Sequence, residues 1–271
     1  MDAALQRRIQ RYGWDKAAEY YENFWQKQLK PAQDLLLTLA MLKDSEKVID
    51  IACGTGLISF RAAAAVGDTG SVLGTDISDK MISSSIETAR KENWGNVRFV
   101  RMDAEELNVP DNSYEVALCS LGLMYFPDPL KAMKEMHRVL KPGGRAIASV
   151  WGQRINCGWA EIFPIVDKRV ASEVCPMFFQ LGNKQVLQMT FESAGFSDLQ
   201  SERLPTLLHY NTTAEACGAA FEGGPVALAY AKFNDAVKQE ARAEYVASIK
   251  KYQMGESFEV PGEFVVTRGY K

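Results

Sequence analysis

Hydrophobic positions in the first 45 residues recur at helical spacing, and many of them are aromatic. The segment 2–28 predicts one or two helices, whose aromatic positions are Tyr12, Trp14, Tyr20, Tyr21, Phe24 and Trp25. Pro31 suits the first turn of a helix, so we expect it to open a further helix. The leucines at helical spacing after it are Leu35, Leu36, Leu39 and Leu42. Residues 1–45 are therefore expected to form a helical unit.

From Glu46 onwards, short apolar runs alternate with helical patterns. The predicted strands are 47–52, 71–76, 97–101, 115–119 and 145–151, and the predicted helices between them are 57–66, 79–93 and 129–140. Strands that alternate with helices imply right-handed crossovers and a mostly parallel sheet. We therefore predict an α/β, Rossmann-like core over residues 46–151, with helices on both faces of the sheet.

After Trp151 this alternation stops. Residues 152–182 are rich in aromatic side chains but show no clean strand pattern; a helix at 183–194 and a strand at 197–204 follow, then a helix at 235–252 and a strand at 263–270. The last two strands bring the predicted sheet to seven. We predict an insertion over residues 152–196 and the remaining core strands and C-terminal helices over 197–271.

Composition and charge narrow the class of protein. The chain has 271 residues, of which 31 are basic and 34 acidic, so the net charge of −3 offers no electrostatic basis for binding nucleic acid. The five cysteines are widely spaced and form no Cys-x-x-Cys pair, which favours a reduced chain without a metal centre. We find no apolar run long enough for a signal peptide or a membrane span. These features predict a cytoplasmic protein and leave peripheral contact with a membrane open. We expect a monomer or homodimer.

The turn after the first predicted strand is the first candidate for ligand binding. Ligands of open α/β sheets bind at the carboxyl ends of the strands, where Gly54 and Gly56 would let a ligand approach the backbone closely. A dinucleotide turn would have a third glycine where Ser59 stands. Asp50 would repel a pyrophosphate but would suit an ammonium group, which S-adenosylmethionine carries in its methionine part. The turn therefore favours S-adenosylmethionine over NAD.

Acidic residues also follow the next two predicted strands. Asp76 ends the second strand, where a carboxylate can accept hydrogen bonds from both ribose hydroxyls, a feature that NAD enzymes share. Asp103 follows the third strand and could accept from an adenine amino group, with Ile77 and Met81 as apolar neighbours of the ring. These residues predict a nucleoside ligand without separating the two cofactors.

Together these segments resemble a class I S-adenosylmethionine-dependent methyltransferase, of the group typified by ubiquinone/menaquinone biosynthesis enzymes. The segments that carry the resemblance are 48–56, 74–76, 102–105 and 140–144, and the resemblance covers about residues 10–151. It implies a methyltransferase that uses S-adenosylmethionine and acts on a small molecule.

The resemblance also implies a role for particular residues. Ala52 stands where the family usually has its first glycine, and Gly54 and Gly56 would lie against the methionine part of the cofactor. The backbone of Ser120 would also contact the methionine group. Asp76 would bind the ribose, and Asp103 with Ala104 would lie at the adenine. Trp14 and Tyr21 belong to a segment that usually forms a lid over the cofactor, and the insertion 152–196 would cap the acceptor.

Each of these residues also has a plain structural interpretation. The glycines could serve only the turn, Asp76 could cap a helix, Asp103 could be a solvated loop acid, and Trp14 and Tyr21 could pack between helices. The aromatic residues between Trp159 and Phe179 could bind an apolar acceptor or fill their own small core.

Three hypotheses about the function remain open from the sequence. The first is methylation of O, N or C on a small apolar or aromatic acceptor, achieved mainly by proximity and orientation. His209 is the one candidate general base. The second is an NAD(P)-dependent oxidoreductase, and the third is a protein that binds S-adenosylmethionine without catalysis. The sequence does not identify the acceptor.

Overall fold

Residues 3–40 form one long helix. The computed structural model describes residues 3–171, 175 and 177–271; the parts of the predicted helical unit and insertion at residues 1–2, 172–174 and 176 lie outside this range. Helix α1 runs over Ala3–Ala40 and includes Pro31. The prediction that Pro31 opens a separate helix was therefore wrong. Leu29, Ala32 and Leu36 are buried on either side of the proline, so packing holds the helix together across the missing N–H group.

The predicted alternation of strands and helices is confirmed. The strands are β1 (Lys47–Ile51), β2 (Ser71–Asp76), β3 (Val97–Arg101), β4 (Tyr114–Ser120), β5 (Leu140–Trp151), β6 (Ser197–Tyr210), β7 (Gln253–Met254) and β8 (Ser257–Tyr270). Their order is β3-β2-β1-β4-β5-β8-β6, and the two-residue β7 pairs with β8. The first five strands are parallel, whereas β8 is antiparallel to both neighbours. The Rossmann-like, mostly parallel sheet is thus as predicted.

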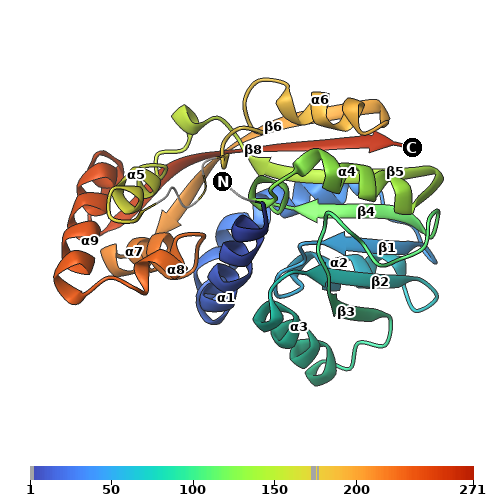
Figure 1. The fold of residues 1–271 in the computed structure, drawn as a ribbon, viewed down its shortest axis with the longest axis horizontal. Helices are drawn as coiled ribbons and strands as arrows, with labels where there is room; N and C mark the ends of the chain where they lie inside the picture. The colour runs from blue at the N-terminus through green and yellow to red at the C-terminus, as the bar shows by residue number, and fades with distance from the viewer. Residues whose placement is uncertain (1–2, 172–174, 176) are drawn as a thin grey trace.

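Helices cover both faces of this sheet, as Figure 1 shows. The longer ones are α2 (Leu57–Val66), α3 (Asp79–Lys91), α4 (Pro129–Val139), α6 (Val186–Ser193), α7 (Thr213–Phe221) and α9 (Asp235–Ile249); the shorter α-helices are α5 (Ile162–Asp167) and α8 (Ala227–Tyr230), and the 3₁₀ turns are Leu123–Tyr125, Arg154–Asn156 and Lys250–Tyr252. Strand residues alternate between the faces. Val48 and Leu118 join the core under α2, whereas Ile49 and Cys119 join the core under α4.

The second half of the chain departs most from the prediction. Strands β6 and β8 are both longer than expected and pair from Gln200 and Arg268 out to Tyr210 and Phe258. Pro205 lies inside this ribbon, which the edge position of β6 permits. Helices α7 and α8 were not predicted.

The ribbon of β6 and β8 extends beyond the core sheet and carries a group of helices (Figure 1). This outer helical group consists of α5, α7, α8 and α9, and both α7 and α8 also contact α1. Helix α6, although within the predicted insertion, packs on α4 and β8 instead. Helix α1 therefore lies where the core sheet and the outer helical group meet.

Candidate active site

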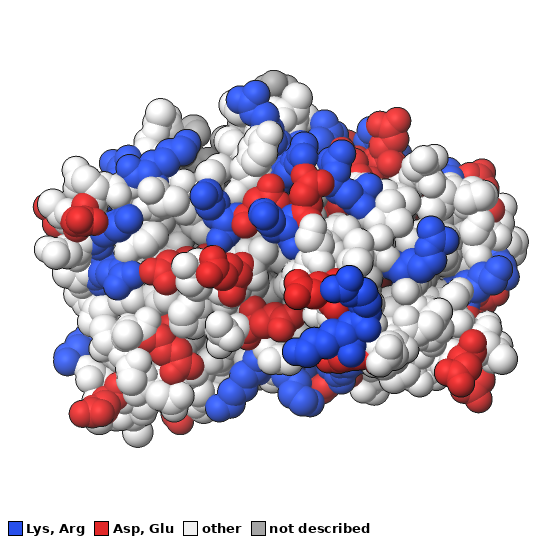
Figure 2. Space-filling view, turned by 90° about the horizontal axis from the view of Figure 1, so that it is seen from below, with Lys and Arg blue, Asp and Glu red and all other residues white. Residues whose placement is uncertain are grey.

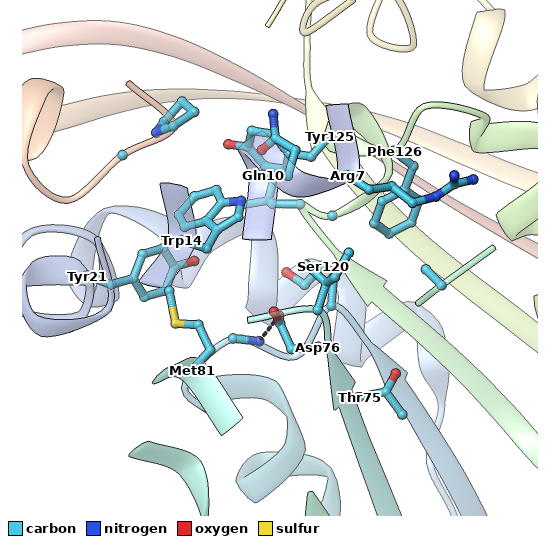
Figure 3. Close-up of a pocket in the computed structure, with 18 of the residues that line it drawn as sticks. Arg7, Gln10, Trp14, Tyr21, Thr75, Asp76, Met81, Ser120, Tyr125 and Phe126 are labelled. Atoms are coloured by element: carbon cyan, nitrogen blue, oxygen red, sulfur yellow. Dashed lines mark hydrogen bonds between the residues drawn. The ribbon is translucent and has the colours of Figure 1, made fainter. Parts of the chain in front are cut away.

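A pocket lies at the carboxyl ends of the core strands, between the sheet and α1. The empty space in it and at its open mouth together amounts to about 1020 Å³. The predicted residues that line it are Trp14, Tyr21, Ala52, Gly54, Asp76, Ile77, Met81, Asp103, Ala104 and Ser120. Figure 3 shows Trp14 and Tyr21, from α1, facing Asp76 and Ser120 at the strand ends. The fold thus brings together all but three of the predicted site residues.

Two tight turns form the floor of the pocket. Gly54 and Ala52, after β1, and Leu121, after β4, all have positive φ angles, of 56°, 56° and 59° respectively. Such angles are costly for residues other than glycine and tend to occur where a site needs them. The turns bend the two strand ends away from the space that a ligand would occupy.

Asp76 is the central polar group of the floor. Its carboxylate accepts a hydrogen bond of 2.9 Å from the Gly54 N–H and another of 2.9 Å from the Ser78 N–H; the first is the dashed line in Figure 3. Burial raises the pKa of Asp76 to about 6. A carboxylate has about four acceptor positions, so these hydrogen bonds leave room for a ligand donor. The cap of helix α3 is Ser78, which accepts from the Met81 N–H, so Asp76 is not needed as a helix cap.

Ion pairs hold the start of α1 over the pocket. The Arg7 Nε lies 2.9 Å from Asp103 Oδ2, and the Arg7 guanidinium also pairs with the buried Glu105. Asp103 Oδ1 accepts from the Glu105 N–H at 2.9 Å, yet the Asp103 side chain keeps 34% of its exposure. Further along α1, Asp15 accepts from the Ser78 hydroxyl at 2.6 Å. The Arg7 contacts could not be predicted, because no local sequence pattern relates residues so far apart.

Three predicted residues lie outside the pocket. Asp50 is fully buried beneath the turn and accepts a 2.6 Å hydrogen bond from the Ser59 hydroxyl. Gly56 has a φ of 93°, and a Cβ there would lie 2.7 Å from the Phe60 ring, so it serves the turn. His209 lies on the outer part of β6, half exposed, with its Nδ1 3.5 Å from Glu259. The structure therefore provides no ligand contact for these three.

Asp50 should make the stability of the protein depend on pH. Burial, together with the nearby Asp76, raises its pKa to about 7, although the Ser59 hydrogen bond acts in the opposite direction. Between pH 4 and pH 7 the folded chain would hold a proton that the unfolded chain has lost, so stability contributed by Asp50 falls as pH rises. We expect Asp50→Asn to flatten this slope by up to about 1.4 kcal/mol per pH unit in urea unfolding. An unchanged slope would contradict the burial argument.

One wall of the pocket is aromatic. It includes Trp25, Tyr125, Phe126, Trp151, Trp159 and Phe178. The Trp151 and Trp159 rings lie 4.7 Å apart, and Trp159 lies 5.6 Å from Phe178. Trp159 also packs against Phe163 and Phe179, so this segment fills part of its own core while Trp159 and Phe178 line the pocket. Sequence reasoning missed Trp25 and Trp151 as pocket residues, because they come from α1 and the end of β5.

Two further features of the described part of the chain bear on the class of protein. Within residues 3–171, 175 and 177–271, no three His, Cys, Asp or Glu side chains are grouped so that they could hold a metal ion. No helix in that part of the chain has the length and apolar character needed to cross a membrane.

Comparisons with known proteins agree with this geometry. A family model described as "Methyltransferase domain" matches residues 42–202. Demethylmenaquinone methyltransferase of Staphylococcus aureus is 34% identical over 174 residues, which cover 59% of this chain and 71% of that protein. The chain therefore belongs to the class I S-adenosylmethionine-dependent methyltransferases.

Solved structures share the fold at lower identity. The YcgJ protein of Bacillus subtilis superposes with a TM-score of 0.63 at 18% identity, over 89% of this chain and 98% of that one. A putative methyltransferase from Bacillus halodurans gives 0.62 at 20% identity, over 89% and 99%. Phosphoethanolamine N-methyltransferase 2 of Haemonchus contortus, solved with S-adenosyl-L-methionine, gives 0.62 at 18% identity, over 95% and 57%. The protein is thus a methyltransferase that uses S-adenosylmethionine as its methyl donor.

Proposed function

We propose that this enzyme methylates a small, apolar, aromatic acceptor. The observation that carries the proposal is the composition of the pocket, in which a polar floor at the strand ends continues into a wall of tryptophan and phenylalanine side chains. A wall of this kind favours flat apolar molecules. The methyl acceptor of the Staphylococcus aureus relative, as its name states, is demethylmenaquinone, which has that character.

The residues of the floor fit the methyl donor. Asp76, which lines the pocket, would accept hydrogen bonds from the ribose hydroxyls. Asp103 and Ala104 would lie at the adenine, with Ile77 and Met81 against its ring. When bound, the donor supplies a methyl group already activated on a sulfonium centre.

The methionine part of the donor would lie along the two turns of the floor. Ala52, Gly54 and Ser120 line this region, and Trp14 and Tyr21 of α1 cover it. We propose that Asp50 and Gly56 support the turn from beneath rather than touch the ligand, since Asp50 is fully buried and Gly56 faces the Phe60 ring. This revises the direct contact with the donor's ammonium group that the sequence predicted for Asp50.

We propose that position and exclusion of water account for most of the rate enhancement. Among the described residues that line the pocket there is neither histidine nor lysine. The carboxylates of Asp103 and Glu105 are paired with Arg7. In this proposal Asp76 would hold the ribose. In-line displacement on an activated methyl group chiefly requires a close and aligned nucleophile.

The distribution of charge on the surface supports a small molecule, and not nucleic acid, as the partner. On the face shown in Figure 2, which looks at the molecule from below, basic and acidic side chains are intermixed without a continuous basic stripe.

We further propose that residues 1–45 act as a lid, that 46–151 hold the cofactor, that 152–196 contribute to the cap, and that 197–271 complete the sheet and the outer helices. A monomer or homodimer would suffice for this pocket.

The decisive experiment combines ligand binding with turnover. Calorimetry should show binding of S-adenosylhomocysteine and none of NADH. Labelled methyl groups should then pass from S-adenosylmethionine to one of a panel of phenols, amines and quinols that includes a demethylmenaquinol analogue. Binding without turnover on any of them would support a catalytically inactive protein, and binding of NADH alone would support an oxidoreductase.

A further inference from the structure

Two tryptophan side chains of the pocket have no partner for their N–H groups. Trp25 is 7% exposed and Trp159 is 5% exposed, and both line the pocket. The Nε1 atoms of both are buried, and neither has a hydrogen-bond partner. Buried polar groups in proteins are nearly always paired, so each unpartnered donor calls for an explanation. Two of them in one pocket point to a ligand that would pair with them.

The two indoles lie on the same aromatic wall. Their ring centres are 6.5 Å apart. The ring of Trp151 lies near both, at 6.1 Å from that of Trp25 and 4.7 Å from that of Trp159. The Trp25 Nε1 lies beside the backbone of Gly223, where an added Cβ would be 3.3 Å away, and the next residue, Gly224, lines the pocket. Both tryptophans thus belong to the aromatic wall of the pocket.

The chemistry of the indole N–H limits what can pair with it. This group only donates, so its partner must be an atom that accepts a hydrogen bond. The acidic residues of the pocket, Asp76, Asp103 and Glu105, come from the strand-end floor. A carbonyl, phenol or phenolate oxygen would accept from these N–H groups, whereas an ammonium group, which cannot accept, could use only the ring faces of the wall.

We infer that Trp25 and Trp159 determine acceptor specificity by donating hydrogen bonds to ring oxygen of a flat, oxygen-bearing aromatic acceptor. This inference rests on the proposed function, because it names the substrate class of the same pocket. It selects phenols and quinols over amines and over plain hydrocarbons of the same shape. The competing explanation is that each N–H points at the face of a neighbouring ring, such as Trp151 or Phe178, and has no role in recognition.

Binding of matched probes tests this inference without requiring turnover. With S-adenosylhomocysteine present, we expect 1-naphthol to bind more tightly than naphthalene. Trp25→Phe and Trp159→Phe should each weaken 1-naphthol binding by about two- to tenfold, the worth of one hydrogen bond, and change naphthalene binding by less than about twofold. Affinity for S-adenosylhomocysteine should stay unchanged in both variants. Trp94→Phe is the matched control, because the Trp94 N–H donates to Glu92 at the surface, 3.0 Å away.

A measurement on the unaltered protein covers the case in which a variant does not fold. The chain has five tryptophans, so a ¹⁵N-correlated spectrum resolves five indole N–H signals. Two of them should move downfield when 1-naphthol is added, and naphthalene should not produce this shift.

Several results would overturn the inference. Equal losses for 1-naphthol and naphthalene would mean that the tryptophans only pack, and no loss for either would favour the ring-face explanation. Tighter binding of 1-naphthylmethylammonium than of 1-naphthol, or no binding of 1-naphthol at millimolar concentration, would also reject it. Failure of the proposed function would give a different result. No acceptor would be methylated, whatever the relative affinities for 1-naphthol and naphthalene are.

Discussion

Asp76→Ala should weaken S-adenosylhomocysteine binding by at least about a hundredfold. The substitution removes a carboxylate that would accept two ribose hydroxyls, and hydrogen bonds to a charged group are worth about 1.5–3 kcal/mol each. It also leaves the N–H groups of Gly54 and Ser78 without their present partner. Calorimetric titration measures the effect. Asp68→Asn, which changes an exposed acid in the turn between α2 and β2, is the control and should bind normally.

The same carboxylate should make cofactor binding depend on pH. Because burial raises the pKa of Asp76 to about 6, the free protein would lose the ionised carboxylate as pH falls below that value. Ribose hydroxyls donate to the ionised form, so affinity for S-adenosylhomocysteine should fall by up to about tenfold per unit below pH 6. Asp76→Asn should bind weakly with no such slope. A wild-type affinity that stays constant from pH 5 to pH 8 would argue against the ribose role.

Most of the floor of the pocket was predictable because parallel strands end at one edge of a sheet. Once the alternation of strands and helices was read, Gly54, Asp76 and Asp103 had to meet there, and they do. The position of Asp50 illustrates the limit of this reasoning. Strand residues alternate, so Asp50 shares the face of Val48 and points under α2 to Ser59, not out of the strand end. The alternation of side chains along a strand is therefore enough to predict that Asp50 is buried under α2.

The aromatic wall and the lid contacts could not be predicted in this way. Trp25, Trp151 and Trp159 come from α1, β5 and the segment after it, and hydrophobic periodicity does not say which distant side chains meet. The pairing of Arg7 with Asp103 and Glu105 is likewise a contact between residues about a hundred positions apart. His209 lies away from the pocket because β6 runs on to Tyr210, which places it on the outer part of the ribbon.

Gly122→Ala should damage both the fold and the site, because two turns of the floor meet there. A Cβ on Gly122 would lie 2.6 Å from the Ala52 Cβ and 2.9 Å from the Cys119 Sγ, far closer than side-chain carbons approach. We expect a loss of about 1–3 kcal/mol in the free energy of unfolding, the usual cost of overpacking. S-adenosylhomocysteine affinity should fall at least tenfold, since Ala52 and Gly122 both line the pocket. Urea unfolding and calorimetry measure the two effects.

A compensating change at Ala52 makes this prediction specific to the contact. Ala52 has a φ of 56°, an angle that suits glycine, so Ala52→Gly alone should change stability little. In the double variant the Ala52 Cβ is gone, so part of the lost stability and affinity should return, with a coupling of at least about 1 kcal/mol. The remainder is the contact with Cys119. Gly95→Ala, where an added Cβ meets nothing within 4 Å, should remain within about 0.5 kcal/mol of wild type. Additive effects of the two substitutions would mean that an added Cβ at Gly122 does not press on Ala52, and would contradict this explanation of the loss.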